Sequence, residues 1–236
     1  MYTVAVVLAG GSGSRMGTRI RKQYLDLGGH PLIWHSLNAF QESDVDEIVL
    51  VCAADDLDEV RAEYTALFDK IGAVVPGGRE RYHSVYAGLC AIDACDRVLI
   101  HDGARPFVSA EIIDRCLKAL EKEDACVAAM PSKDTVKIVD DSGYAVSTPD
   151  RTRVWNVQTP QCFRFPLVKK AYDALIEAER NGTLGDVHVT DDAMVVEMFT
   201  DTRVRMIEGS YDNIKITTPE DMTVGSAILN KTLTQN

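Results

Sequence analysis

A glycine-rich segment near the start of the chain carries the residue types that chemistry on phosphate groups requires. It follows an unbroken apolar run at 4–8, which is typical of a strand buried on both faces. Three of the four residues at 10–13 are glycines, and glycines let the backbone approach a ligand and point several N–H groups at it. The cations Arg15 and Lys22 follow. A buried strand, a glycine loop and nearby cations together favour a site for a polyphosphate.

The spacing of the glycines does not match two familiar phosphate loops. The Rossmann fingerprint needs the pattern G-x-G-x-x-G at the start of a helix, and here Gly17 lies one place too late. A Walker A loop needs Gly-Lys-Ser/Thr after its last glycine, and this segment has no such sequence. A simple turn after a strand is therefore the alternative interpretation.

A second group of candidate residues follows another apolar run, at 98–100. Asp102 comes almost directly after this run, where a carboxylate suits Mg²⁺ or a substrate hydroxyl. The alternative is a turn, because Asp-Gly is a common turn pair. Arg105 either anchors the loop that follows or contacts the ligand.

Two further segments offer groups to the same site. The turn at 77–84 leads into a helix, whose first N–H groups are free donors. It fits recognition of a nucleotide base and a plain helix cap equally well. Lys215 is flanked by isoleucines, so in a strand its side chain would point to the opposite face from theirs. It is either a charge on an edge strand or a cation directed into the cleft.

The elements that must position these residues alternate between strand and helix. Such alternation predicts right-handed βαβ units and a mainly parallel, Rossmann-like α/β sheet with helices on both faces. Ligands bind beyond the carboxyl ends of such strands, so the segments above should converge on one cleft. The expected strands are 4–8, 47–51, 73–75, 98–100 and 125–130, and the expected helices are 31–40, 55–68, 82–92 and 109–122.

The alternation breaks at about 134–161, which reads as an arm. Residues 135–139 and 144–148 flank a polar turn and predict a β-hairpin that projects from the domain. Its charges also fit an exposed hairpin with no function beyond solubility. Beyond it we expect helices at 166–180 and 190–199, strands at 204–207 and 213–217, and a last helix that begins at Thr218-Pro219. The chain is expected to be one domain over 1–236, with this arm.

Composition narrows the function. The net charge of −11 argues against a nucleic-acid-binding protein, which needs basic surface. The six cysteines form no C-x-x-C pair, so we expect small buried hydrophobic residues in a reducing compartment. The chain shows no signal-peptide pattern and no apolar run of membrane-spanning length. We therefore expect a cytoplasmic protein that contacts no membrane.

Eight ordered segments resemble one enzyme family. The first two alone, LAGGSGSRMG and KQY, resemble the signature of sugar-nucleotide pyrophosphorylases and related cytidylyltransferases. With GGRERYHSV, HDGARPF, KDTVK, DRTRVWNVQTPQ, TDDA and DNIKITTPED, they resemble the 2-C-methyl-D-erythritol 4-phosphate cytidylyltransferase family of the non-mevalonate isoprenoid pathway over nearly the whole chain. The resemblance implies an enzyme that transfers CMP from CTP to the sugar phosphate and releases pyrophosphate, with Mg²⁺ as cofactor.

The resemblance also implies roles for single residues. Arg15 and Lys22 would stabilise the transition state, while Arg151 and Lys215 would position the sugar phosphate. Asp102 would face the polyol or hold the metal. The residues implied to bind substrate are Ala9, Gly10, Gly11, Gly13, Gly78, Ser84, Asp102, Gly103, Arg105, Thr135 and Thr159. The chain departs from the family at Arg79, where the family has Asp, which puts a side-chain contact to cytosine in doubt.

The family is also expected to be a homodimer in which each arm completes the partner's cleft. Two rival functions differ from this one. Ribitol-5-phosphate cytidylyltransferases share LAGG, GSRMG, TPQ and NIKITTP but typically lack the KDTVK and TDDA segments. A nucleotide-sensing module without turnover is the rival from another class, and it would release no pyrophosphate from CTP.

Overall fold

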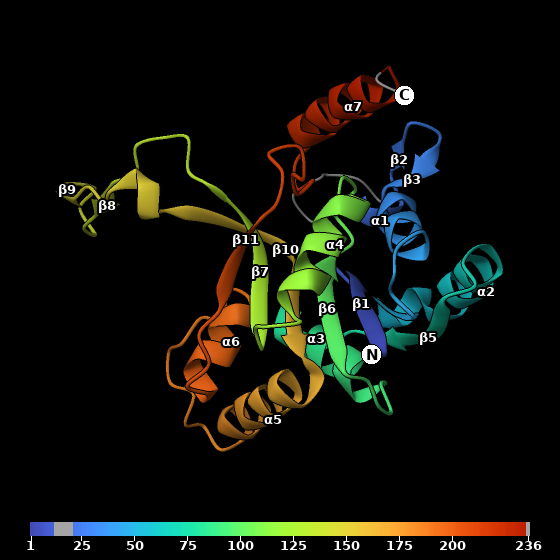
Figure 1. Ribbon diagram of the computed structural model, residues 1–236, viewed down its shortest axis with the longest axis horizontal. Coiled ribbons are helices and arrows are strands. Elements are labelled where there is room, and N and C mark those ends of the chain that lie inside the picture. The colour runs from blue at the N-terminus through green and yellow to red at the C-terminus, as the bar shows by residue number, and fades with distance from the viewer. Residues whose placement is uncertain (12–20, 235–236) are drawn as a thin grey trace.

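A central seven-stranded sheet organises the chain, which the computed structural model describes for residues 1–11 and 21–234 (Figure 1). The strand order is β11-β7-β10-β6-β1-β4-β5. Neighbouring strands are parallel except for the two pairs that β10 makes. The mainly parallel α/β sheet is thus confirmed. The strands are β1 (Thr3–Ala9), β4 (Glu47–Cys52), β5 (Ile71–Pro76), β6 (Arg97–Asp102), β7 (Ala125–Pro131), β10 (Trp155–Arg164) and β11 (Arg205–Glu208).

Helices cover both faces of the sheet and bury two cores. Side chains alternate along β1, so that Ala5 and Val7 face one core while Val4 and Val6 face the other. The first core packs against α1 (Leu32–Gln41), α2 (Leu57–Leu67) and α4 (Ala110–Ala119). The second packs against α3 (Arg81–Cys90), α5 (Phe165–Arg180) and α6 (Asp192–Phe199). Among the described residues, no helix is long and apolar enough to cross a membrane.

The register of the parallel strands brings distant segments to one edge of the sheet. Leu8 lies opposite Asp102, and Ala9 lies opposite Cys52. The glycine segment, the turn after β5 and the segment after β6 therefore leave the sheet side by side. This confirms the expected convergence at the carboxyl ends of the strands.

Local capping signals locate several helix starts correctly. The Ser109 side chain accepts a hydrogen bond from the N–H of Ile112 at the start of α4. Asp191 accepts one from the N–H of Met194 at the start of α6. At the start of α7 (Pro219–Leu233), the carboxylate of Asp221 accepts from the N–H groups of the two threonines that precede Pro219. Each of these bonds satisfies a donor that the first helical turn leaves free.

Short elements link the glycine segment to α1. The segment continues into a 3₁₀ turn, η2 (Lys22–Tyr24), and then into the paired strands β2 (Asp26–Leu27) and β3 (His30–Pro31). Gly28 and Gly29 join these strands with φ values of 68° and 92°. Positive φ at both central residues is what a tight two-residue hairpin requires, which accounts for the pair of glycines. A second 3₁₀ turn, η3 (Ala54–Asp56), precedes α2.

The strand predicted at 213–217 is wrong. This segment is irregular backbone that crosses the carboxyl ends of the strands. It is held by single bonds instead of a ladder, because the N–H of Ile216 donates to the carbonyl of Ala104 and the amide of Asn213 donates to the carbonyl of Thr159. Ile214 and Ile216, on either side of Lys215, gave the alternation that resembled a strand.

The arm extends away from the sheet, on the left of Figure 1. Its strands β8 (Ile138–Val139) and β9 (Ala145–Ser147) pair with each other and with nothing else, within the part of the chain described. Asp140 closes the turn between them by accepting hydrogen bonds from the N–H groups of Ser142 and Tyr144. A 3₁₀ turn, η4 (Arg151–Arg153), then leads back to β10.

Candidate functional site: a charged cleft at the carboxyl ends of the strands

Two adjoining cavities lie where the segments converge. The first has a volume of about 530 Å³ and the second about 280 Å³. Arg81, Asp102 and Lys215 line both of them and so form the wall between the two. Of the residues predicted to act, the first cavity is lined by Ala9, Gly10, Gly11, Lys22, Gly78, Ser84, Asp102 and Lys215, and the second by Asp102, Arg105, Thr159 and Lys215.

Gln23 fixes the glycine segment where it leaves the sheet. Its buried side-chain amide donates to the carbonyl of Ala9 and, at 3.2 Å, to that of Gly11. The neighbouring Lys22 reaches across the cleft, and its ammonium group donates to the carbonyl of Ile216 at 3.0 Å. The cation is therefore held over the first cavity by backbone on the opposite side. Arg15 and Gly13, both predicted to act here, lie outside the described residues.

The turn before α3 is shaped by close packing at two glycines. A side chain on Gly77 would approach the Ser84 hydroxyl oxygen to 2.7 Å, and one on Gly78 would approach the Cβ atom of His83 to 2.3 Å. With glycine at 78, the N–H of that residue donates to the Ser84 hydroxyl at 3.1 Å. The turn thus closes onto the first helical turn of α3, where the N–H of Glu80 donates to Nδ1 of His83 at 3.2 Å in a capping box.

Among the described residues, the side chain of Arg79 forms ion pairs and makes no contact of the kind that would recognise a nucleotide base. Its guanidinium lies 3.5 Å from the carboxylate of Glu179 at the end of α5 and 3.7 Å from that of Glu80. Glu179 also accepts from the Tyr82 hydroxyl at 2.9 Å. The departure from the family at position 79 therefore coincides with a surface contact that ties the turn to α5.

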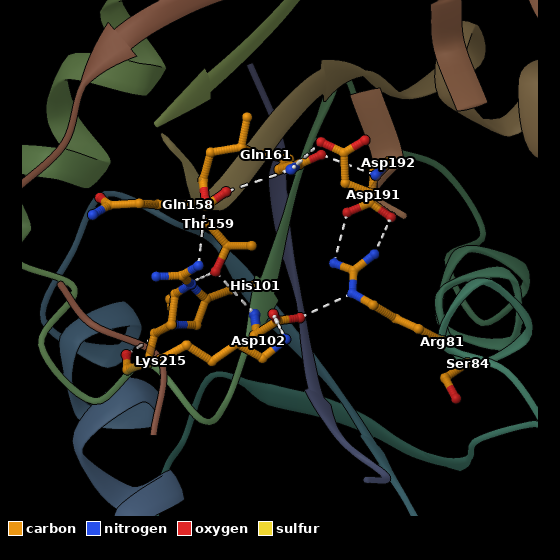
Figure 2. A network of polar contacts seen from close by, with 12 residues as sticks. Arg81, Ser84, His101, Asp102, Gln158, Thr159, Gln161, Asp191, Asp192 and Lys215 are labelled. Carbon is orange, nitrogen blue, oxygen red and sulfur yellow. Dashed lines mark hydrogen bonds and ion pairs between the residues drawn. The ribbon is translucent and has the colours of Figure 1, made fainter. Parts of the chain in front are cut away.

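A chain of alternating charges forms the wall between the cavities (Figure 2). Lys215 lies 2.6 Å from one oxygen of Asp102, and the Nε atom of Arg81 donates to the other oxygen at 3.0 Å. The two terminal nitrogens of Arg81 then donate to both oxygens of Asp192, each at 2.8 Å. Asp192 is fully buried and also accepts from the hydroxyl of Tyr172. Two cations and two carboxylates thus balance each other.

This arrangement controls the protonation of Asp102. Burial alone would raise the pKa of its carboxyl, but the adjacent charges of Arg81 and Lys215 outweigh burial and hold the pKa well below its usual value. Burial likewise opposes the charge on Arg81, while Asp192 and Asp102 raise its pKa. Asp102 is therefore an ionised carboxylate at any pH near neutrality, able to accept hydrogen bonds or bind a cation but not to donate a proton.

His101, the residue before Asp102 on β6, supports Asp102 as a neutral ring and not as a cation. Its Nε2–H donates to the carbonyl of Arg105 at 3.2 Å, so its Nδ1 accepts from the Thr159 hydroxyl at 2.9 Å. That hydroxyl oxygen in turn accepts from the N–H of Asp102 at 3.1 Å. Complete burial lowers the pKa of His101 to about 4, so the ring is neutral at physiological pH. Its function is to orient Thr159 and the backbone at Asp102.

Gln161 locks the start of α6 against β10. Its side-chain oxygen accepts from the N–H groups of Asp192 and Ala193, at 3.0 and 2.9 Å, and its amide nitrogen donates to Asp191 at 3.0 Å. These bonds fix the carboxylate of Asp192 where it meets Arg81 (Figure 2). β10 therefore positions the far end of the wall as well as one side of the second cavity.

Arg105 and Gly103 serve mainly as supports. Arg105 donates to the carbonyls of Asn213 and Val157, at 2.8 and 3.4 Å, and so anchors the irregular C-terminal segment to β10. Gly103 lies beneath the cleft and lines neither cavity, since its N–H donates to the carbonyl of Leu8 and a side chain there would clash with Ile33.

Comparison with known proteins identifies the family of this chain. The model of the family described as IspD, 2-C-methyl-D-erythritol 4-phosphate cytidylyltransferase, matches residues 3–231.

This chain belongs to the IspD family.

Two similar proteins with that family name extend the match. One from Lachnospira eligens is 48% identical over 227 residues, covering 95% of this chain and 98% of the relative. One from Clostridium perfringens is 44% identical over 221 residues, covering 93% and 95%.

Solved structures of IspD relatives share the fold. The crystal structure of 4-diphosphocytidyl-2C-methyl-D-erythritol synthase from Anaerococcus prevotii superposes with a TM-score of 0.85 at 36% identity, covering 97% of this chain and 96% of that one. The IspD structure from Francisella tularensis has a TM-score of 0.78 at 30% identity, covering 97% of this chain and all of that one. The likeness therefore extends over nearly the whole chain.

Two residues that the IspD resemblance assigns to the substrate lie away from the cleft of their own chain. Thr135 and Arg151 are exposed and line neither cavity. Within the described residues, the guanidinium of Arg151 donates to the backbone carbonyl of Lys133, at 3.5 Å. The predicted site residues thus fall into two groups, one gathered in the cleft and one on the arm.

Two residues of the wall of the IspD cleft, Arg81 and Asp192, were not predicted from the sequence, whereas Asp102 and Lys215 were. Arg81 lay inside the GGRERYHSV segment but was assigned no role, and Asp192 was interpreted as part of a helix cap. Only Asp191 caps α6, which leaves the second aspartate free to bind Arg81. Two adjacent acids at one cap were a usable signal, because one cap position needs only one of them.

Proposed function

We propose that this chain transfers CMP from CTP to 2-C-methyl-D-erythritol 4-phosphate, giving 4-diphosphocytidyl-2-C-methyl-D-erythritol and pyrophosphate in non-mevalonate isoprenoid precursor synthesis. The observation that carries the proposal is the double cavity. The first cavity is lined by the backbone of the glycine segment, the turn before α3 and Lys22, and the second is lined by cations that suit another phosphate. The chain that holds them matches the IspD family over residues 3–231. Two adjoining anion sites are what a transfer between two phosphorylated substrates needs.

In this mechanism CTP occupies the first cavity. Its base rests against the turn that Gly78 and Ser84 close, and its phosphates meet the backbone of the glycine segment. Lys22 lies above that segment as a mobile point charge for oxygens that gain negative charge in the transition state. We assign Arg15 the same task.

The polyol phosphate occupies the second cavity. Its phosphate is drawn to Lys215, and Asp102 and the backbone around Thr159 accept from its hydroxyls. An oxygen of this phosphate attacks the α-phosphorus of CTP in line. The new P–O bond forms as the bond to the β-phosphate oxygen breaks, and pyrophosphate leaves. Positioning and charge neutralisation supply the catalysis, since no proton transfer is required of the protein.

Mg²⁺ fits one part of this cleft. The cation prefers oxygen ligands and typically uses one or two carboxylates together with substrate phosphates. Asp102 is the carboxylate that lines both cavities, and its two oxygens are now shared between Arg81 and Lys215. Asp102 would hold the ion by releasing one of these partners, and the ion would neutralise charge on the triphosphate.

The arm supports a homodimer with shared sites. An isolated hairpin is marginal in water, and this one is exposed on all sides with Thr135 and Arg151 on it. Each arm would lie across the partner and bring these two residues to the partner's second cavity. The six unpaired cysteines suit a reducing compartment, and we place the enzyme in the cytoplasm.

A substrate panel tests the proposed function. The four nucleoside triphosphates are each incubated with methylerythritol, ribitol and glycerol phosphates, and pyrophosphate release is measured. We expect release only with CTP, and far faster with methylerythritol phosphate than with the other acceptors. A preference for ribitol phosphate would assign the chain to the rival activity, and absence of release with every pair would leave only nucleotide binding.

A further inference from the structure

Three buried cysteines meet on the face of the sheet that packs against α4. Cys126 on β7 and Cys162 on β10 lie directly opposite each other across the two strands. Cys116 on α4 packs over them, and the three sulfur atoms lie within 4.8 Å of one another. All three side chains are fully buried, at 0% exposure. Of the remaining cysteines Cys90 is exposed, so the expectation of six buried ones is wrong for that residue.

The surroundings of this trithiol cluster, defined as Cys116, Cys126 and Cys162, are apolar. Its members belong to the core that α1, α2 and α4 bury; the Cys126 thiol lies 3.6 Å from the backbone carbonyl of Cys116, and the three thiols also hydrogen-bond one another. Burial raises the pKa of the Cys162 thiol well above its usual value, because a thiolate there would lose its hydration. A ligand whose complex with the three sulfurs carries a net charge is therefore disfavoured in this core.

We propose that the trithiol cluster is a binding site for trivalent arsenic, taken up as arsenous acid. Three thiols condense with one As(OH)₃, forming three As–S bonds and releasing three water molecules. The oxidation states of arsenic and sulfur do not change, and the As(SR)₃ product is neutral. Arsenic(III) keeps a lone pair, so its three As–S bonds form a pyramid that draws the sulfurs closer together, and the cluster, whose sulfurs already lie within 4.8 Å of one another, must contract around it.

Other thiophilic ions fit this cluster less well. Zn²⁺ in structural sites takes four ligands in a tetrahedron, and this group offers three. Three thiolates around Zn²⁺ or Cu⁺ would also leave one or two negative charges in the core, which arsenic avoids. The neutral charge of the arsenic complex is thus the reason that the cluster favours arsenic over Zn²⁺ and Cu⁺.

The position of the cluster predicts how binding behaves. Because no thiol of the cluster is exposed, arsenous acid enters it only when α4 opens locally, so uptake is slow and becomes independent of arsenite concentration once opening limits it. Along β10, the neighbouring Gln161 points to the opposite face, where it holds α6. Occupancy of the cluster should therefore leave the cleft and its activity unchanged, and should raise the unfolding temperature because the ligand binds only the folded chain.

The experiment incubates the full-length chain, reduced with a phosphine, with sodium arsenite. Native mass spectrometry then counts arsenic per chain, and X-ray absorption at the arsenic edge counts the sulfurs bound to it. We expect one arsenic with three sulfur neighbours. Cys116→Ala, Cys126→Ala and Cys162→Ala should each raise the arsenite concentration for half-saturation at least tenfold. The matched controls Cys90→Ser and Cys95→Ser should leave it unchanged.

Three outcomes would overturn the proposal. Failure of the wild-type chain to retain arsenic would remove the site outright. Two sulfurs with an oxygen as the third neighbour would show that the cluster cannot close around the ion. Retention by a chain that lacks all three cysteines would locate arsenic elsewhere. The first two are read on the wild-type chain, so the test does not depend on whether a core variant folds.

Discussion

The cleft and the arm follow opposite structural rules. In the cleft, each charged side chain of the wall has a partner of opposite charge within 3.0 Å, and Asp192 at its end is fully buried. On the arm, Arg151 is exposed and held by one long hydrogen bond to backbone. The charges of the wall are paired within their own chain, whereas Arg151 on the arm lines neither cavity of its own chain. The proposed homodimer, in which each arm lies across the partner, would account for this difference.

The largest expected effect comes from breaking the wall at its buried end. Asp192→Asn removes one charge of a buried, bidentate ion pair, which typically costs about 3–5 kcal/mol because the remaining charge is left unpaired. Thermal unfolding should shift strongly downwards, and kcat should fall because Arg81 no longer holds Asp102. The exposed Asp201→Asn is the matched control and should change neither.

A double variant sharpens this prediction. Arg81→Met combined with Asp192→Asn removes both partners, so no unpaired charge remains in the core. Its unfolding temperature should exceed that of Asp192→Asn alone, while its kcat should be no lower than that of Arg81→Met alone. If the loss of kcat in the double variant equalled the product of the losses in the two single variants, Asp192 would not act through Arg81.

Lys22→Ala tests the catalytic side of the cleft. Loss of a group that stabilises charge in the transition state typically lowers kcat by roughly 10²–10³. The KM for CTP should change much less, because the interaction strengthens only as the reaction proceeds. Steady-state kinetics measure both constants, with exposed Lys170→Ala as the control. A normal kcat with a raised KM would make Lys22 a simple binding residue.

The buried imidazole of His101 predicts a loss of stability in acid. Its pKa is lowered from 6.5 to about 4 on folding, so between these values the unfolded chain binds more protons than the folded chain. Its contribution is therefore complete above pH 6.5 and is lost as the pH falls towards 4, by up to roughly 3 kcal/mol. Urea unfolding of His101→Gln should show a flatter pH dependence in this window than either the wild type or the control His188→Gln. Equal slopes in all three would contradict the prediction.

The smallest expected effect concerns the arm. Arg151→Ala should raise the KM for the polyol phosphate while CTP affinity stays near normal, since the lost contact is one charge-assisted hydrogen bond of about 1.5–3 kcal/mol. Arg153→Ala, on the same 3₁₀ turn and equally exposed, is the matched control. Calorimetry that showed CTP binding lost instead would assign Arg151 to the nucleotide.

The sequence could predict features that depend on periodic patterns or on residues close together in the chain. The apolar runs gave the strands, and Ser109 and Asp191 gave helix starts, because a cap bonds within three residues of itself. The wall was not predictable in this way, since Arg81 and Asp192 are 111 positions apart and meet only through the sheet. The trithiol cluster escaped for the same reason, because strand register and not cysteine spacing brings its sulfurs together. At 213–217, the alternation Ile214-Lys215-Ile216 imitated the period of a strand in a segment that single hydrogen bonds hold as irregular backbone.

A mixing experiment tests most directly whether the cleft of one chain works with the arm of the other. Lys22→Ala and Arg151→Ala homodimers are each assayed at a polyol phosphate concentration where both are nearly inactive, and are then refolded together. In a heterodimer with shared sites, one cleft receives both defects, and the other combines an intact Lys22 with an intact arm. Random pairing should then restore about a quarter of wild-type activity. If each site is built from one chain, every site keeps one defect, and a mixture as inactive as its parents, with heterodimers shown to be present, would contradict the shared site.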